Sequence, residues 1–484
     1  MSTVVRSKRR YTLFSNRALA VLIIPIVIES AFTMSLGLAD SFMVQSVGEN
    51  GTAMSAVSNV DQISNVMIQL FAAFGTGGAI ITSQSLGAGR TEDASRSAKQ
   101  LYVLMLLASV IVAAVCLIFN HQIIDLVYND GATGYKDYAY TYFYLMAASY
   151  PLLAMFYASA AVLRAQRRSM NTMTSAGISF ALNVGFNALF IYGLNLGVMG
   201  AGIATVISRA FPAVFLTVRL TNKHNIVRVK LFERFRFDGK IIKKILFLAI
   251  PSGIESCLFQ VGKVMTASFV ADASYNVAAA GGGLVNNANV ANSVTANINT
   301  IGSIAGNGIN TSVLTVVGQA VGTGDEDCVK YYIKKMFSIS LVGNALCVGL
   351  VWALSPLLVG IFSQNITAEA AAMATGCITL CFSVQIFTYP FSFGGSAVLE
   401  ATSDVRYTMI CAVSSMAVMR VGLSFILCTP LIPSLHIGAY GLWTGMTADW
   451  CVRSVLFVWR ILSGKWKKAS GMFPAAVARP PEGK

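Results

Sequence analysis

Long apolar segments follow one another along almost the whole chain, and short polar connections separate them. Each apolar segment has about 20 residues or more, the length that an α-helix needs to cross a bilayer. Strands of a membrane barrel would be about 10 residues long with alternating polar and apolar positions, so these lengths predict helices. The pattern therefore predicts an all-α polytopic membrane protein. Its twelve expected transmembrane helices are 18–42, 53–82, 100–120, 138–160, 172–194, 197–220, 244–270, 278–318, 334–363, 368–396, 406–430 and 438–461.

Composition agrees with this interpretation and argues against an enzyme. Mean hydropathy is +0.65 and charged residues make up 12% of the chain, about half the share of roughly 25% that soluble domains have. The three histidines lie far apart, and the nine cysteines have no spacing typical of a metal site. We therefore predict neither an enzyme nor a cofactor. No basic run contains interleaved aromatic residues in a soluble segment, so we expect no nucleic-acid partner.

Lysine and arginine gather on alternate connections, which predicts the orientation in the membrane. The basic positions are Arg6, Lys8, Arg9, Arg10, Arg17, Arg90, Arg96, Lys99, Arg164, Arg167, Arg168, Lys330, Lys334, Lys335 and Arg406. The intervening connections 45–53, 271–276, 363–369 and 430–436 contain no Lys or Arg. By the positive-inside rule, both termini are expected in the cytoplasm of a cell whose cytoplasmic (inner) membrane holds the chain. The net charge of +14 then reflects topology and contact with anionic membrane lipid.

The sequence contains an internal duplication. The stretch "IIPIVIES" (23–30) returns as "AIPSGIES" (249–256), and its proline and glutamate both return 226 positions later. The stretch "QSLGAG" (84–89) returns as "QAVGTG" (319–324). A weaker pair is "AVLRA" (161–165) and "AVLEA" (397–401), in which Arg164 is replaced by Glu400.

Each repeat occurs after the same number of spans, so the two halves should share one orientation and be related by an axis along the membrane normal. Carriers built from repeats commonly hold substrate between them and move one half against the other. The connection 219–244 is the longest, with nine Lys or Arg, and we interpret it as a linker. The expected division is a cytoplasmic N-terminal tail (1–17), an N-terminal six-helix lobe (18–220), a basic cytoplasmic linker (221–243), a C-terminal six-helix lobe (244–461) and a cytoplasmic C-terminal tail (462–484).

Two acids in the first span are the leading candidates for chemistry, because a carboxylate in the bilayer costs at least about 2.5 kcal/mol. Glu29 and Asp40 are 11 residues apart, about 20° past three helical turns, so one helix face carries both. Pro25 lies one turn before Glu29 and can act as a hinge, as can Pro251. Glu29 has a repeat mate in the second half, so a structural hydrogen bond and a functional role both remain open. Asp40 has none, since the equivalent position is Thr266, and we favour function.

Further polar positions lie within other spans. Asn183 and Asn187 are four residues apart and share a face of the fifth span. The eighth span is rich in Asn, which would be costly against lipid and predicts a helix along the water-filled interface between the halves. We predict a coupling-ion or proton site at Asp40, Glu29, Asn183 and Asn187. We predict a substrate cavity at Glu255, Lys263, Asn292 and Asn299.

Several motifs, taken in chain order, resemble those of prokaryotic multidrug and toxic compound extrusion (MATE) transporters. They are "LIIPIVIESAFTMSLGLADSFMVQSVG" (22–48), "TGGAIITSQSLGAGR" (76–90), "VLRAQ" (162–166), "LNVGFNALFIYGLNLGVMGAGIAT" (182–205), "IPSGIESCLFQVGK" (250–263) and "GAYGLWTG" (438–445). The resemblance implies export of amphipathic, usually cationic organic compounds, driven by inward flow of H⁺ or Na⁺, through two six-helix lobes that alternate access.

The resemblance also assigns residues one by one. Asp40 matches the first-helix acid used for cation coupling, with a Na⁺ ion near it as the one metal expected, and Pro25 matches the proline at which that helix bends. Asn183 matches the fifth-helix asparagine, whereas Asn187 stands where many prokaryotic members have aspartate, so one ionisable group is missing. Glu255 resembles a seventh-helix acid of some branches. We expect a monomer. The alternatives are a lipid-linked oligosaccharide flippase of the same superfamily, which should have a strongly cationic central cavity, and a channel or receptor.

Overall fold

A computed structural model describes residues 13–44, 52–127, 135–223, 225–230, 236–281, 287–362, 367–429 and 437–470. The basic residues from Arg6 to Arg10, most of the connections 45–53, 363–369 and 430–436, and the end of the C-terminal tail lie outside these ranges. The described chain is helical almost throughout, as the lengths of its apolar segments predicted.

The first half forms one lobe. Its helices are α1 (Asn16–Val44), α2 (Thr52–Gly87), α3 (Thr91–Ile118), α4 (Asn120–Val127), α5 (Tyr135–Ala148), α6 (Tyr150–Ala165), α7 (Ser169–Asn187), the π-helix η2 (Ala188–Gly193) and α8 (Gly197–Thr221). The second half forms the other lobe. Its helices are α9 (Gly239–Gly281), α10 (Asn287–Gly302), α11 (Ile304–Gly322), α12 (Glu326–Ala353), α13 (Ser355–Phe362), α14 (Ala368–Ala401), α15 (Val405–Ser415), the π-helix η3 (Met416–Leu423), α16 (Ser424–Cys428) and α17 (Ala439–Leu462), followed by α18 (Trp466–Ser470).

The prediction of twelve membrane spans is confirmed. Nine helices of the described chain are long and apolar enough to cross a membrane, and the pair α5 and α6, bent by 42° at Ser149, makes a tenth. The broken pair α10 and α11 and the more polar α17 complete the twelve. Each of these overlaps one of the predicted apolar segments.

Three predicted boundaries were wrong. The segment 278–318 is two helices that meet at Ser303, and its first residues belong to α9, which continues to Gly281 because its end is rich in alanine, a strong helix former. The segment 334–363 is also two helices, and α12 begins at Glu326 because the Asp325 carboxylate accepts a hydrogen bond from the backbone N–H of Asp327 at 3.0 Å. Likewise α3 begins at Thr91 rather than near residue 100, because its polar first turns lie before the apolar run.

The duplication predicted from the sequence is visible in the helix lengths. Helices α3 and α12 have 28 residues each, and each is followed by a helix of 8 residues, α4 or α13. Each lobe also has one π-helical segment, η2 or η3, at the same place in the order of spans. The two six-helix lobes are therefore pseudo-symmetric.

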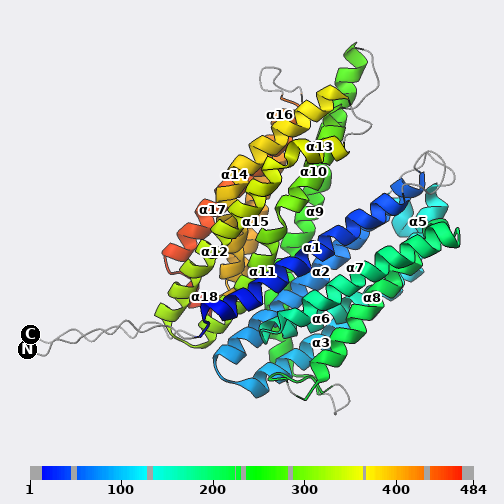
Figure 1. Ribbon diagram of the computed structural model, residues 1–484. Helices are drawn as coiled ribbons and strands as arrows, with labels where there is room; N and C mark the ends of the chain where they lie inside the picture. Colours follow the sequence, from blue (N-terminus) through cyan, green and yellow to red (C-terminus); the bar gives the residue numbers. More distant parts are fainter. Residues whose placement is uncertain are drawn as a thin grey trace, which may run out of the picture.

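The two lobes lie side by side at the end where α1 begins and α17 ends, called here the termini end, and diverge toward the other end (Figure 1). Helices α1 and α2 of the first lobe pack against α9 and α11 of the second. Because α1 runs from the termini end toward the divergent end, Glu29 lies midway along it and Asp40 lies near its divergent end.

The duplicated glycine motifs close the termini end. The Gln84 side-chain amide donates to the Ala401 carbonyl at 2.9 Å, and the Gln319 amide donates to the Ala165 carbonyl at 2.8 Å, so each motif reaches into the opposite lobe. A Cβ atom on Gly87 would overlap the backbone carbonyl of Gln319. Glycine is needed here because the two backbones touch.

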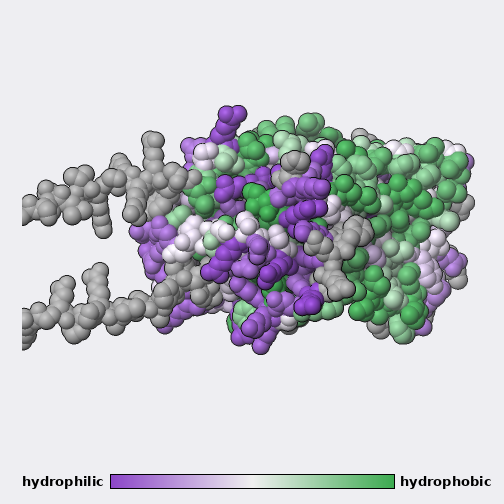
Figure 2. Space-filling model, turned by 90° about the horizontal axis from the view of Figure 1, so that it is seen from below, coloured by the Kyte–Doolittle hydropathy of each residue, from purple (hydrophilic) through white to green (hydrophobic). Residues whose placement is uncertain are grey.

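The surface is divided in the same direction. Polar side chains cover the end near the termini, and apolar side chains cover the remaining length of the lobes (Figure 2). The exposed basic residues at this end include Arg90 before α3, Arg96 in the second turn of α3 and Lys240 at the start of α9. The apolar surface fits a hydrocarbon environment, as expected of a multi-pass membrane protein.

Candidate functional site

The outer part of the first lobe holds a buried acid with two amides. Asp40 on α1 is 5% exposed. The Asn187 side-chain amide on α7 donates to one Asp40 carboxylate oxygen at 2.6 Å and to the Asn183 amide oxygen at 3.2 Å. The structure therefore brings together three of the four residues predicted for the coupling site.

A second acid, which the sequence analysis missed, lies near the first. Asp61 on α2 accepts a hydrogen bond from the Tyr142 hydroxyl at 3.3 Å. It interacts electrostatically with Asp40 and with Arg209 of α8, whose guanidinium donates to the Ser149 hydroxyl at 2.7 Å. Asp61 and Arg209 are isolated charges within predicted spans, so the penalty for charge in the bilayer could have identified both.

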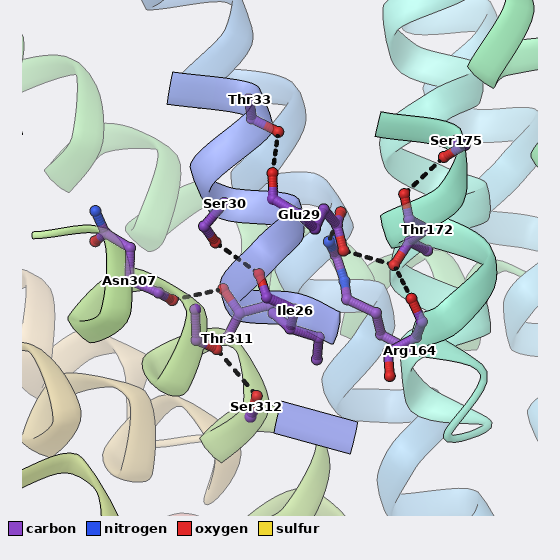
Figure 3. Close-up of polar contacts among 12 residues, drawn as sticks. Ile26, Glu29, Ser30, Thr33, Arg164, Thr172, Ser175, Asn307, Thr311 and Ser312 are labelled. Carbon is purple, nitrogen blue, oxygen red and sulfur yellow. Dashed lines mark hydrogen bonds and ion pairs between the residues drawn. The ribbon is translucent and has the colours of Figure 1, made fainter. Parts of the chain in front are cut away.

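The fourth predicted residue, Glu29, has its own partners. One Glu29 carboxylate oxygen is 2.8 Å from the Arg164 guanidinium of α6, and the other accepts a hydrogen bond from the Thr172 hydroxyl of α7 at 2.5 Å (Figure 3). Since Asp40 also contacts α7, the prediction that one face of the first helix carries both acids is confirmed.

A cavity of about 220 Å³ adjoins Glu29 between the lobes. Its polar lining comes from α1, α2, α6 and α11, namely Glu29, Ser30, Thr33, Thr76, Arg164, Thr311 and Thr315. A water molecule occupies about 30 Å³ in the liquid, so the cavity has room for several. Its volume is smaller than the 300–1,000 Å³ or so of typical ligand pockets.

The residues predicted for a substrate cavity are spread over two helices. Glu255 on α9 is half-buried, and its Oε2 has no hydrogen-bond partner in the described chain. Lys263, two turns further along α9, is exposed. On α10, Asn292 is half-buried, and the Asn299 amide oxygen is 3.6 Å from the Cys381 sulfur of α14. No hydrogen bond or ion pair joins these four predicted residues to one another in the described ranges.

Three charged residues of the second lobe were not predicted. The Arg453 guanidinium on α17 donates to Asp449 at 2.9 Å, and the Ser415 hydroxyl donates to the same carboxylate oxygen at 2.6 Å. Arg420, in η3, is 3% exposed. All three lie inside predicted spans, where one or two charged residues hardly lower the average hydropathy.

The two lobes differ at equivalent positions. In the first, Glu29 forms an ion pair with Arg164. In the second, the equivalent residues are Glu255 and Glu400, and the Glu400 carboxylate accepts a hydrogen bond from Ser396 at 3.1 Å. The hinge candidates, Pro25 and Pro251, both lie inside continuous helices, α1 and α9. Among the described residues, no group of three or more His, Cys, Asp or Glu side chains is placed to hold a metal ion.

Comparison with known proteins agrees with this architecture. The MatE family model matches residues 25–189 and 251–426. The uncharacterized transporter YisQ of Bacillus subtilis (strain 168) is 25% identical over 91% of this chain and 93% of its own length. The "Probable multidrug resistance protein NorM" of Thermotoga maritima (strain ATCC 43589 / DSM 3109 / JCM 10099 / NBRC 100826 / MSB8) is 25% identical over 95% of this chain and 97% of its own length.

Among solved structures, an outward-facing conformation of a multidrug resistance MATE family transporter of the MOP superfamily superposes with a TM-score of 0.82. It is 22% identical and covers 93% of this chain and 96% of its own. The family model matches well over half of the sequence and includes residues of both lobes, and the solved structure has the same fold as this chain. The chain therefore belongs to the MatE family, the multidrug and toxic compound extrusion transporters.

Proposed function

We propose that this transporter is a cation-coupled antiporter, driven by H⁺ or Na⁺, that exports amphipathic and mostly cationic organic compounds by alternating access. The observation that carries the proposal is Asp40, a buried carboxylate near the divergent end that accepts a hydrogen bond from the Asn187 amide and has no ion-pair partner within the described chain. The multidrug resistance name of the Thermotoga relative supports the substrate class. The polar surface of the termini end, with the exposed Arg90, Arg96 and Lys240, supports a cytoplasmic location for that end.

The groups around Asp40 suit reversible ion binding. The Asn187 amide oxygen and the Asn183 amide nitrogen are buried without a hydrogen-bond partner in the described ranges. A Na⁺ ion prefers oxygen ligands, which the Asp40 carboxylate and the Asn187 amide oxygen would provide. A proton would instead neutralise the carboxylate directly. In either case the bound cation removes the negative charge that attracts a cationic substrate, so coupling ion and substrate compete.

Asp61 provides the second carboxylate of this lobe. Family members with aspartate at the position of Asn187 have two acids on α1 and α7, whereas here the second acid comes from α2. It interacts electrostatically with Asp40, and Arg209 partly offsets the repulsion between the two carboxylates. The lobe therefore has two neighbouring acids that could hold one coupling ion between them.

Glu29 is proposed as an anchor rather than an ion carrier. Both of its carboxylate oxygens are engaged by Arg164 and Thr172, which leaves little capacity for a coupling ion. The anchor holds the middle of α1 to α6 and α7. Pro25, one turn before it, would be the hinge about which the helix bends when Asp40 is neutralised.

The test is ethidium efflux from energised cells, with Na⁺ and pH gradients imposed separately. We expect wild type to respond to one gradient and Asp40→Asn to lose that response. The control is Asp125→Asn, which removes an exposed acid that pairs with Lys136 outside the spans and should export like wild type. Undiminished, gradient-dependent efflux by Asp40→Asn would show that the coupling group is elsewhere. No efflux by wild type, with the protein present in the membrane, would favour the lipid-linked oligosaccharide flippase.

A further inference from the structure

Three cationic side chains of the second lobe gather around one aromatic ring. The ring of Phe259 on α9 lies 4.3 Å from the Arg420 guanidinium, 5.3 Å from the Arg453 guanidinium and 5.3 Å from the Lys263 ammonium. These residues come from η3, α17 and α9, so three elements of the lobe place positive charge at a single point.

Among the described residues, one of these three cations is in direct contact with a carboxylate. Asp449 pairs with Arg453, whereas neither Arg420 nor Lys263 forms an ion pair in the part of the chain that the structure describes. Glu255 interacts electrostatically with Arg453 and Asp449. Glu400 interacts with Glu255 and is hydrogen-bonded to a serine. Arg420 interacts electrostatically with Asp449, with Arg453 and with the Cys381 thiol, but it forms no direct ion pair with any of them. Two of the three cations around Phe259 therefore have no carboxylate in direct contact within the described ranges.

Arg420 lacks acceptors for its guanidinium. It is 3% exposed, its Nη1 is buried, and its N–H groups donate no hydrogen bond within the described residues. Arg453 likewise has a buried Nη2 without a partner there. A buried charge without hydrogen-bond acceptors is strongly disfavoured. The ring of Phe259 stabilises one face of the Arg420 plane by a cation–π interaction, but it cannot accept hydrogen bonds at the edges.

The backbone at Arg420 is also unusual. η3 interrupts the eleventh span with π-helical geometry from Met416 to Leu423, and Arg420 is its charged residue. π-Helical turns inside α-helices occur frequently at functional sites because they redirect side chains. In the first lobe, η2 begins directly after Asn187, which binds the Asp40 carboxylate. The π-helical segment of each lobe thus adjoins or contains a buried polar side chain, Asn187 in the first lobe and Arg420 in the second.

We propose that the second lobe has a binding site for a monovalent anionic group, with Arg420 and Arg453 as buried donors, Lys263 at the exposed side and Phe259 as the apolar wall. The ligand that satisfies all four is an aromatic carboxylate, since its oxygens accept from the guanidinium groups and its ring packs on Phe259. A free chloride ion offers the same charge without the ring. The site goes beyond the proposed export of mostly cationic compounds, and it would allow acidic or zwitterionic cargo. It does not depend on coupling through Asp40.

The test is equilibrium binding of radiolabelled benzoate to the purified full chain in phosphatidylcholine nanodiscs, with no ion gradient. Benzamide, the neutral analogue, competes as a control for ring packing alone. We expect saturable benzoate binding that benzamide does not displace and that Arg420→Gln weakens about tenfold or more, equal to about 1.4 kcal/mol. Lys263→Gln, at an exposed position that should fold normally, should weaken binding severalfold. The matched control is Arg406→Gln, which removes an arginine 4.6 Å from the ring of Phe247 elsewhere in the lobe.

Competition with chloride in a gluconate background distinguishes the two sources of anion. Displacement of benzoate by millimolar chloride would assign the site to small free anions, and no displacement would assign it to the carboxylate of an organic substrate. The proposal is overturned if unlabelled benzamide displaces radiolabelled benzoate as effectively as unlabelled benzoate does. It is equally overturned if folded Arg420→Gln and Lys263→Gln both bind benzoate like wild type. Because binding is measured without a gradient, failure of cation coupling would leave this result unchanged.

Discussion

Replacing Glu29 with glutamine should destabilise the first lobe by about 3 kcal/mol. The side chains of Glu29 and Arg164 are 5% and 17% exposed, so the pair is mostly removed from water. Breaking such a buried pair costs about 3–5 kcal/mol, because the remaining charge loses its partner. We expect the lower end of this range, since the cavity beside Arg164 can admit water. The glutamine can still accept the hydrogen bond from Thr172.

The measurement is thermal unfolding of purified wild type, Glu29→Gln, Arg164→Gln and the double variant, each in the same detergent. Both single variants should unfold at clearly lower temperature. The double variant, which leaves no unpaired charge, should be more stable than the sum of the two single effects. The control Asp125→Asn breaks an exposed pair with Lys136, which water and salt screen, and should leave the unfolding temperature almost unchanged. Single variants as stable as wild type, or strictly additive losses, would refute the anchor.

Three further predictions concern the motifs and the acids. Gly87→Ala should hold the termini end partly open, because its Cβ overlaps the Gln319 carbonyl, and labelling of cysteines introduced there should rise; unchanged labelling would contradict tight backbone contact. Asp61→Asn should reduce gradient-driven efflux less than Asp40→Asn does, because Asp61 lacks the contact with the amides; an equal loss would make the two acids equivalent. Asn187→Asp should change the relative response to Na⁺ and pH gradients by adding an acid next to Asp40, whereas an unchanged ratio would remove position 187 from the coupling site.

The number of spans could be predicted from the sequence because apolar length alone determines whether a helix crosses the bilayer. Breaks within a span could not be predicted, because a break such as the one at Ser303 leaves the average hydropathy of the span almost unchanged. The start of α12 at Glu326 also lay outside the apolar signal, since its first turns are polar and are fixed by a capping carboxylate.

Residues of the candidate site could be predicted where the spacing along a single helix, or a match to a family motif, was enough to identify them. Spacing along α1 placed Glu29 and Asp40 on one face, and the contacts with α7 agree. Contacts between helices that are distant in the sequence could not be predicted from such spacing. The ion pair of Glu29 with Arg164 and the position of Asp61 near Asp40 were therefore missed. Arg420 was missed because a single arginine hardly lowers the mean hydropathy of an otherwise apolar span.

The reciprocal contacts of Gln84 and Gln319 preserve the geometry of a two-fold dimer within a single chain. The glutamine of each half donates to the last residue of the fourth span of the other half, which is Ala401 at the end of α14 or Ala165 at the end of α6. This reciprocal contact is the arrangement of an isologous interface. An ancestral six-helix subunit with this motif could have paired with its own copy in parallel orientation. Fusion then freed each half to change independently, and the carboxylate–amide site of one lobe and the arginine cluster of the other are what such divergence would produce.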